Sequence, residues 1–165
     1  MKNTQAPRDA GGLPVRHLAP DMALNALPLG TTVLTLDGQL PVEYLTPGDR
    51  VISRNSGTAR LVALRPFRRT VAAVGIAAGT LGNQKPEQDA VLCAAQEILV
   101  RDWRASALFG ASHALVPVAR LIDGNFIRPM GLQDLHLFEL VFETPQIIYA
   151  DGLELAANAM VTASA

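Results

Sequence analysis

The feature of this sequence that most constrains its fold is a tight-turn signal that recurs along the chain. It consists of an Asp-Gly pair next to runs of β-branched and aliphatic residues, and it occurs at 37–38, 123–124 and 151–152. Aspartate and glycine both tolerate the positive φ angles that two-residue hairpin turns require. The pattern therefore predicts β-hairpins, with expected strands at 31–36 and 39–44, at 119–122 and 125–128, and at 146–150 before the third pair.

Weaker turn signals lie in the sequence between these expected hairpins. Asn55-Ser56-Gly57 and Pro47-Gly48-Asp49 are both typical of turns. Turn signals at this spacing indicate an all-β fold with little helix, which we expect only around residues 103–109. The polar stretch 79–89 predicts a long loop, and such a loop flanks a functional site about as often as it is inert.

Proline and glycine divide the chain into one domain and two tails. Prolines and glycines interrupt residues 1–23 so often that neither a helical nor a strand pattern of apolar residues persists, and we expect a flexible N-terminal tail there. A total of 165 residues fits one domain, which we place at 24–157, followed by a C-terminal tail at 158–165. The basic run at 65–69 is expected to be a solvated strand end.

Composition excludes several classes of partner and site. Fourteen basic and fifteen acidic residues give a formal net charge of -1, whereas nucleic acid or an anionic membrane favours a basic partner. The single cysteine, Cys93, excludes an internal disulfide and a cysteine-based zinc site. No apolar run has the length of a signal peptide or a membrane span. We therefore expect a cytoplasmic protein by default, with secretion by a route that uses no such signal left open.

Five segments, in order, resemble the bacterial hedgehog/intein (Hint) family of autoprocessing domains. They are Leu29–Val33, Gly38–Val51, Ile98–Gly110, Leu115–Gly124 and Ile147–Gly152. Members of that family begin with a nucleophile, followed by a Gly-Thr strand, a hairpin and a Gly-Asp turn. The resemblance spans roughly residues 26–157 and implies a pseudo-symmetric, horseshoe-shaped all-β fold of hairpins. Its active centre would lie where the two halves meet.

The resemblance also implies that the reactive groups of the family are missing here. Hint domains break the bond before a first Cys, Ser or Thr, whose side chain attacks the preceding carbonyl while a Thr-x-x-His or Ser-x-x-His histidine donates to the departing nitrogen. The first position falls on Ala26, and the Thr-x-x-His segment falls on Cys93-Ala94-Ala95-Gln96. Two further histidine positions fall on Glu139 and Pro145, and a Glu-Ser pair falls on Ala156-Ala157.

We therefore predict a pseudoenzyme in which no catalytic residue is intact. The vestigial positions are Ala26, Cys93, Gln96, Glu139 and Pro145. Such a domain would bind a protein or peptide partner or serve a structural role, with no cofactor, metal, nucleic acid or membrane involved.

Two alternatives stay open at this point. The first is an active autoprocessing domain whose nucleophile is displaced to Thr31, Thr32 or Cys93, although Cys93 lies in an apolar strand typical of a buried, inert thiol. The second is a small enzyme that reuses the fold with His113 or His136. Together with His17, these histidines match no local metal-binding motif.

Overall fold

The computed structural model describes residues 22–161, which contain twelve β-strands, one α-helix and short 3-10 turns. The strands are β1 (Leu27–Pro28), β2 (Thr32–Thr35), β3 (Gly38–Pro41), β4 (Arg50–Ser53), β5 (Gly57–Arg60), β6 (Ala63–Ile76), β7 (Ala90–Cys93), β8 (Glu97–Val100), β9 (Ala114–Pro117), β10 (Ile127–Phe142), β11 (Gln146–Ala150) and β12 (Leu153–Ala159). The helix is α1 (Trp103–Phe109), and the 3-10 turns include η2 (Val42–Tyr44) and η3 (Val118–Leu121). The expected all-β class is confirmed. Most of the two predicted tails, and His17 with them, lie outside the described residues.

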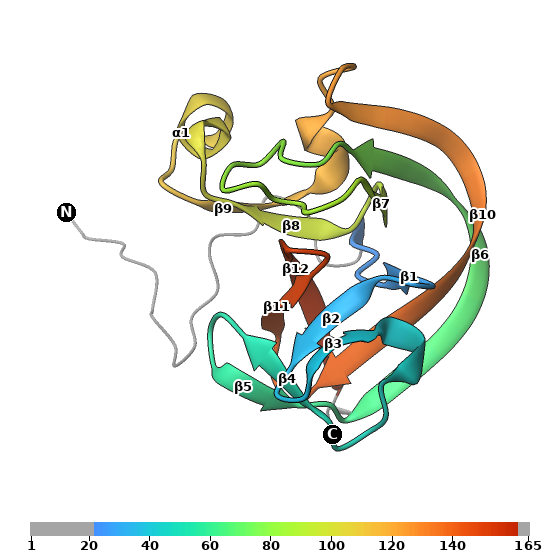
Figure 1. Cartoon of the computed structure of the whole chain (residues 1–165). Coiled ribbons are helices and arrows are strands. Elements are labelled where there is room, and N and C mark those ends of the chain that lie inside the picture. The colour runs from blue at the N-terminus through green and yellow to red at the C-terminus, as the bar shows by residue number, and fades with distance from the viewer. Residues whose placement is uncertain (1–21, 162–165) are drawn as a thin grey trace.

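Two long strands give the molecule its curved outline. β6 and β10 pair antiparallel from Ala63↔Val141 to Ile76↔Ile127, and a bulge interrupts the register between Pro129 and Leu132. Figure 1 shows the two strands sweeping together around one side of the fold. The sheet continues through β12, β11, β4, β2 and β3, while β8 pairs with β12 and β9. Both halves of the chain therefore contribute to one apolar core.

Two of the predicted hairpins are confirmed. β2 and β3 pair around Asp37-Gly38, where Gly38 has a φ of 99°. β11 and β12 pair around Asp151-Gly152, with φ angles of 51° and 79°. The Asp151 carboxylate also accepts hydrogen bonds from the backbone nitrogen and the hydroxyl of Thr32, both at 3.0 Å. This turn therefore fixes the start of β2 as well as the β11–β12 register.

The second half of the first hairpin is shorter than expected, so the prediction of a strand over 39–44 is wrong beyond Pro41. The chain turns there into η2, and the backbone nitrogen of Leu45 donates to the carbonyl of Val42 at 3.2 Å. Proline has no N–H to continue the ladder, and the turn buries the Val42 side chain completely.

The hairpin predicted at Asp123-Gly124 is also wrong. Residues 118–121 form η3 instead of a strand, and the Asp123 carboxylate accepts the backbone N–H groups of Asn125, Phe126 and Ile127, each at 2.9 Å. These backbone hydrogen bonds, above all that from Ile127, lower the pKa of Asp123. Aspartate can cap a local loop as readily as it can occupy a hairpin turn, and the loop forms here.

The predicted helix is confirmed as α1. Asp102 caps its N-terminus by accepting from the backbone nitrogen of Arg104 at 3.0 Å, and Gly110 ends it in a left-handed conformation with a φ of 69°. The stretch 79–89 forms the predicted loop between β6 and β7. No helix within residues 22–161 is long and apolar enough to cross a membrane.

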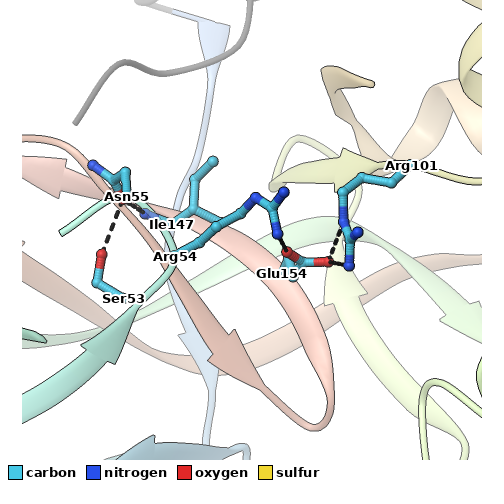
Figure 2. A network of polar contacts seen from close by, with 6 residues as sticks. All are labelled: Ser53, Arg54, Asn55, Arg101, Ile147 and Glu154. Atoms are coloured by element: carbon cyan, nitrogen blue, oxygen red, sulfur yellow. Dashed lines mark hydrogen bonds and ion pairs between the residues drawn. The ribbon is translucent and has the colours of Figure 1, made fainter. Parts of the chain in front are cut away.

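A half-buried carboxylate joins the two halves of the fold near the β11–β12 hairpin. Figure 2 shows Glu154 of β12 between Arg54, which follows β4, and Arg101, which follows β8. The carboxylate oxygens lie 3.0 Å from Arg54 Nη1 and 2.8 Å from Arg101 Nη2. Nearby, Asn55 Oδ1 accepts from the Ile147 backbone and from Ser53 Oγ, both at 2.9 Å. Segments far apart in sequence are thereby held together.

Replacing this carboxylate should destabilise the domain measurably. Glu154→Ala leaves two arginines without their shared partner, and we expect the free energy of unfolding to fall by about 1–2 kcal/mol. Urea denaturation followed by circular dichroism measures this change. Glu143→Ala, at an exposed position in the turn between β10 and β11, is the matched control and should change stability by less than about 0.5 kcal/mol. Equal effects in both variants would contradict the assigned role.

Candidate functional site

Ala26, which the resemblance aligns with the first residue of Hint domains, is buried inside the fold. It precedes β1, which pairs antiparallel with β10 through Leu27↔Phe138 and Pro28↔Leu137. Its side chain is 1% exposed and packs in a small apolar cluster with Cys93 and Leu137. The backbone before the candidate cleavage position is therefore held inside the domain.

The turn between β7 and β8 lies against this backbone. The backbone nitrogen of Gln96 donates to the carbonyl of Cys93 at 3.0 Å, and that of Leu24 donates to the carbonyl of Ala95 at 3.1 Å. The Cys93 thiol donates to the carbonyl oxygen of Ala26, with Sγ and O 3.8 Å apart. The structure thus brings the Asn25–Ala26 segment against Cys93 and Gln96, which lie about 70 positions further along the chain.

Gln96, which the resemblance aligns with the histidine position of the family pattern, is completely buried. Its Nε2 lies 3.2 Å from Asn25 Oδ1, 2.9 Å from the Glu97 carbonyl and 3.0 Å from the Ala156 carbonyl. Its Oε1 has no hydrogen-bond partner within residues 22–161. The carboxamide therefore acts here as a fixed donor that ties the N-terminal segment, β8 and β12 to each other.

Asn25 extends this polar contact into a network. Its Oδ1 accepts from the backbone nitrogen of Glu97 at 2.9 Å, and its Nδ2 donates to Glu97 Oε1 at 2.8 Å and to Asn158 Oδ1 at 3.3 Å. Asn158 Nδ2 donates to Glu139 Oε2 at 2.7 Å, and the other Glu139 oxygen lies 3.8 Å from Arg65 Nη1. Glu139 is therefore linked to the Asn25–Ala26 bond through side-chain amides.

An open hollow lies beside this network. It has a volume of about 340 Å³ and is lined by residues 23–26 on one side and by β6, Glu139 and Asn158 on the other. The β6 wall consists of Arg65, Pro66, Phe67 and Arg69. A second depression lies between the loop at 79–89 and the β11–β12 hairpin.

Cys93 is the only thiol, and its environment opposes ionisation. The side chain is 1% exposed. Burial raises its pKa from 9.0 to about 11, although a backbone hydrogen bond and the positive charge of Arg69 act in the opposite direction. The thiolate is the nucleophilic form of cysteine, and this buried environment disfavours it.

The raised pKa has a consequence for stability at alkaline pH. The folded state favours the neutral thiol, so this contribution is complete below pH 9.0 and is lost as pH rises toward 11. We expect the free energy of unfolding to fall by about 2–3 kcal/mol over that interval from this group. Denaturation at a series of pH values should show a shallower pH dependence for Cys93→Ala than for the unaltered chain. Parallel profiles for the two proteins would contradict the assignment.

The remaining predicted positions lie apart from this cluster. The Pro145 carbonyl accepts from Asn55 Nδ2 at 3.1 Å at an exposed turn. His113 is exposed and contacts Ser112, whereas His136 lies in β10 with its ring centroid 4.7 Å from that of Phe138. Thr32 donates to Asp151. Within the described part of the chain, no group of three or more His, Cys, Asp or Glu side chains could hold a metal ion.

Sequence reasoning missed Asn25, Glu97 and Asn158. Glu97 had a usable signal, since an acidic residue at the start of the apolar strand Glu97–Val100 requires a buried partner. Asn25 directly precedes the vestigial first position. Asn158 had no local signal, because only the parallel pairing of β10 and β12, with Val141↔Asn158, brings it to Glu139 and Asn25.

Comparisons with known proteins agree with this architecture. The solution structure of a bacterial intein-like domain from Clostridium thermocellum is similar with a TM-score of 0.52 and 15% identity, covering 82% of this chain and 100% of that one. A DnaB intein from Synechocystis sp. PCC 6803 has a TM-score of 0.52 and 10% identity, covering 80% and 97%. Identities this low establish the fold alone. No curated protein matches the sequence significantly. The sequence profile of the Hint domain matches residues 26–158, and this chain therefore belongs to the Hint domain family.

Proposed function

We propose that this Hint domain does not cleave its own backbone and acts instead as a module that binds a protein or peptide. The observation that supports the proposal is the chemistry around the Asn25–Ala26 bond. The side chains there are the Ala26 methyl, the Cys93 thiol with a pKa of about 11, and the Gln96 carboxamide. An acyl shift needs a nucleophile and a proton donor for the leaving nitrogen, and this set offers neither near neutral pH.

The role of Gln96 adds to this argument. A carboxamide donates hydrogen bonds but does not transfer a proton near neutral pH. Its nitrogen already serves three acceptors, at Asn25, Glu97 and Ala156. The side chain is suited to holding the centre together, and a binding role is consistent with the open hollow beside it.

Intact-mass spectrometry of the purified chain tests the loss of cleavage. The protein is incubated with a thiol or with hydroxylamine, which release chains held by a thioester or an ester. We expect the full-length mass to persist. A fragment that begins at Ala26 would overturn the proposal.

A second candidate function, cleavage by a displaced nucleophile, is favoured by one contact. Cys93 Sγ lies 3.8 Å from the carbonyl oxygen of Ala26. Attack of this sulfur on the Ala26 carbonyl carbon would break the Ala26–Leu27 bond, leave residues 1–26 as a thioester on Cys93 and free the amine of Leu27. The same mass measurement identifies this reaction by a fragment that begins at Leu27, and Cys93→Ala would abolish it.

A further inference from the structure

One half of β6 carries a free edge. β10 pairs with β6 from Ala63 to Ile76, but β7 pairs only with Ala73–Ile76. Within residues 22–161, the segment 64–71 is therefore hydrogen-bonded to a strand on one side only. In Figure 1 this half of β6, drawn in light green, runs along the outside of the molecule. A free edge presents unpaired N–H and C=O groups that can pair with an added strand.

The side chains along this edge are basic. Arg65, Phe67 and Arg69 occupy alternate positions of β6 and line the 340 Å³ hollow together with Pro66, whereas Arg68 is not among the lining residues. Arg65 lies 3.8 Å from Glu139, and Arg68 lies 3.4 Å from Asp134. Arg69 makes no ion pair with any described residue, and its guanidinium carbon lies 5.0 Å from the centre of the Phe67 ring. The edge thus has one positive charge in excess of the carboxylates beside it.

This charge decides which kind of strand the edge can accept. Pairing with the same edge of a second copy would bring the three arginines of each chain close together, and like charges on neighbouring strands repel. Pro66 lies on the same segment and removes one donor. The edge is therefore unsuited to self-association, and an acidic strand would supply the missing complementary charge.

We propose that the edge of β6 at 64–71 accepts an extended peptide segment of a partner protein, and that an acidic side chain of this segment enters the hollow and pairs with Arg69 and Arg65. Guanidinium groups bind carboxylates through paired, charge-assisted hydrogen bonds. Phe67 and Leu24 line the same hollow and provide apolar contacts for the stem of the acidic side chain. The inference rests on the proposed binding function and adds the class of ligand.

Binding is tested on the full-length chain with a pair of short fluorescent peptides. In both peptides valine and threonine alternate on either side of one central residue, which is glutamate in the first peptide and glutamine in the second. The ends of both are blocked, so the glutamate side chain is the only carboxylate in the pair. In fluorescence anisotropy, we expect the glutamate peptide to bind about tenfold more tightly than the glutamine peptide. Arg69→Gln should remove this preference and leave the affinity for the glutamine peptide unchanged.

Arg68→Gln is the matched control, since both arginines are exposed on the same strand but only Arg69 lines the hollow. It should change the affinity for the glutamate peptide by less than about twofold. Thermal unfolding of both variants verifies that the fold is kept. N-methylation of alternate residues in the glutamate peptide should abolish binding, because it removes the donors that pair with the edge.

Equal affinity for the two peptides, an equal effect of the two arginine variants, or undiminished binding after N-methylation would overturn the inference. Binding of a single-stranded oligonucleotide more tightly than the glutamate peptide would also overturn it. Concentration-dependent dimerisation in sedimentation velocity would do the same. Intact mass is recorded on the same samples, so that a cleaved chain, which refutes the proposed function, is distinguished from an intact chain that fails to bind.

Discussion

The triple variant Ala26→Cys/Cys93→Thr/Gln96→His is expected to cleave the bond between Asn25 and position 26 in the presence of hydroxylamine, whereas the unaltered chain stays intact. The three changes place a thiol at the carbonyl to be attacked and restore the Thr-x-x-His pattern that the Hint resemblance implies. Losing the nucleophile of an enzyme costs on the order of 10⁴- to 10⁶-fold in rate, so a gain of about 10⁴-fold is expected. Intact-mass spectrometry over time measures it.

The double variant Cys93→Thr/Gln96→His is the control for this experiment. It carries the same changes in the turn between β7 and β8 but keeps the Ala26 methyl, and it should remain uncleaved. Circular dichroism of both variants checks that the β fold is retained. A folded triple variant that also stays intact would contradict the assignment of the proposed inactivity to these three positions.

Gln96→Ala is expected to cause the largest loss of stability among single substitutions at the centre. It removes the donor to Asn25 Oδ1 and to the carbonyls of Glu97 and Ala156, and it leaves a cavity at a completely buried position. Unsatisfied buried acceptors and the lost packing together should lower the free energy of unfolding by about 2–4 kcal/mol. Urea denaturation measures the change.

Two further variants separate the hydrogen bonds from the volume. Gln96→Met fills much of the space but cannot donate, so it should also be destabilised, by about 1–3 kcal/mol. Gln39→Ala changes an exposed glutamine of β3 and should stay within about 0.5 kcal/mol of the unaltered chain. A neutral effect of Gln96→Met would show that the amide matters only for packing.

The sequence was sufficient to predict two hairpins in which an Asp-Gly pair lies between strands that pair with each other. In these turns Gly38, Asp151 and Gly152 adopt positive φ angles, which Asp and Gly tolerate. Asp123-Gly124 failed as a hairpin because the Asp123 carboxylate binds three backbone N–H groups. The same residue pair serves two local structures, and sequence spacing alone does not distinguish them.

The centre was predictable in part. Ala26, Cys93 and Gln96 were assigned from the order of the family pattern, and in the structure Cys93 contacts the Ala26 carbonyl while Gln96 contacts the neighbouring Asn25. Pro145 does not join them, as its contact is with Asn55. The amides of Asn25 and Asn158 could not be found in advance, because their contact depends on the register between distant strands.

Carbon-13 NMR of the chain labelled at the asparagine carbonyl carbons observes the bond between Asn25 and Ala26 directly. We expect the Asn25 carbonyl to give a single amide resonance near neutral pH that is unchanged when hydroxylamine is added. A resonance in the downfield range of thioesters or esters, discharged by hydroxylamine, would contradict it.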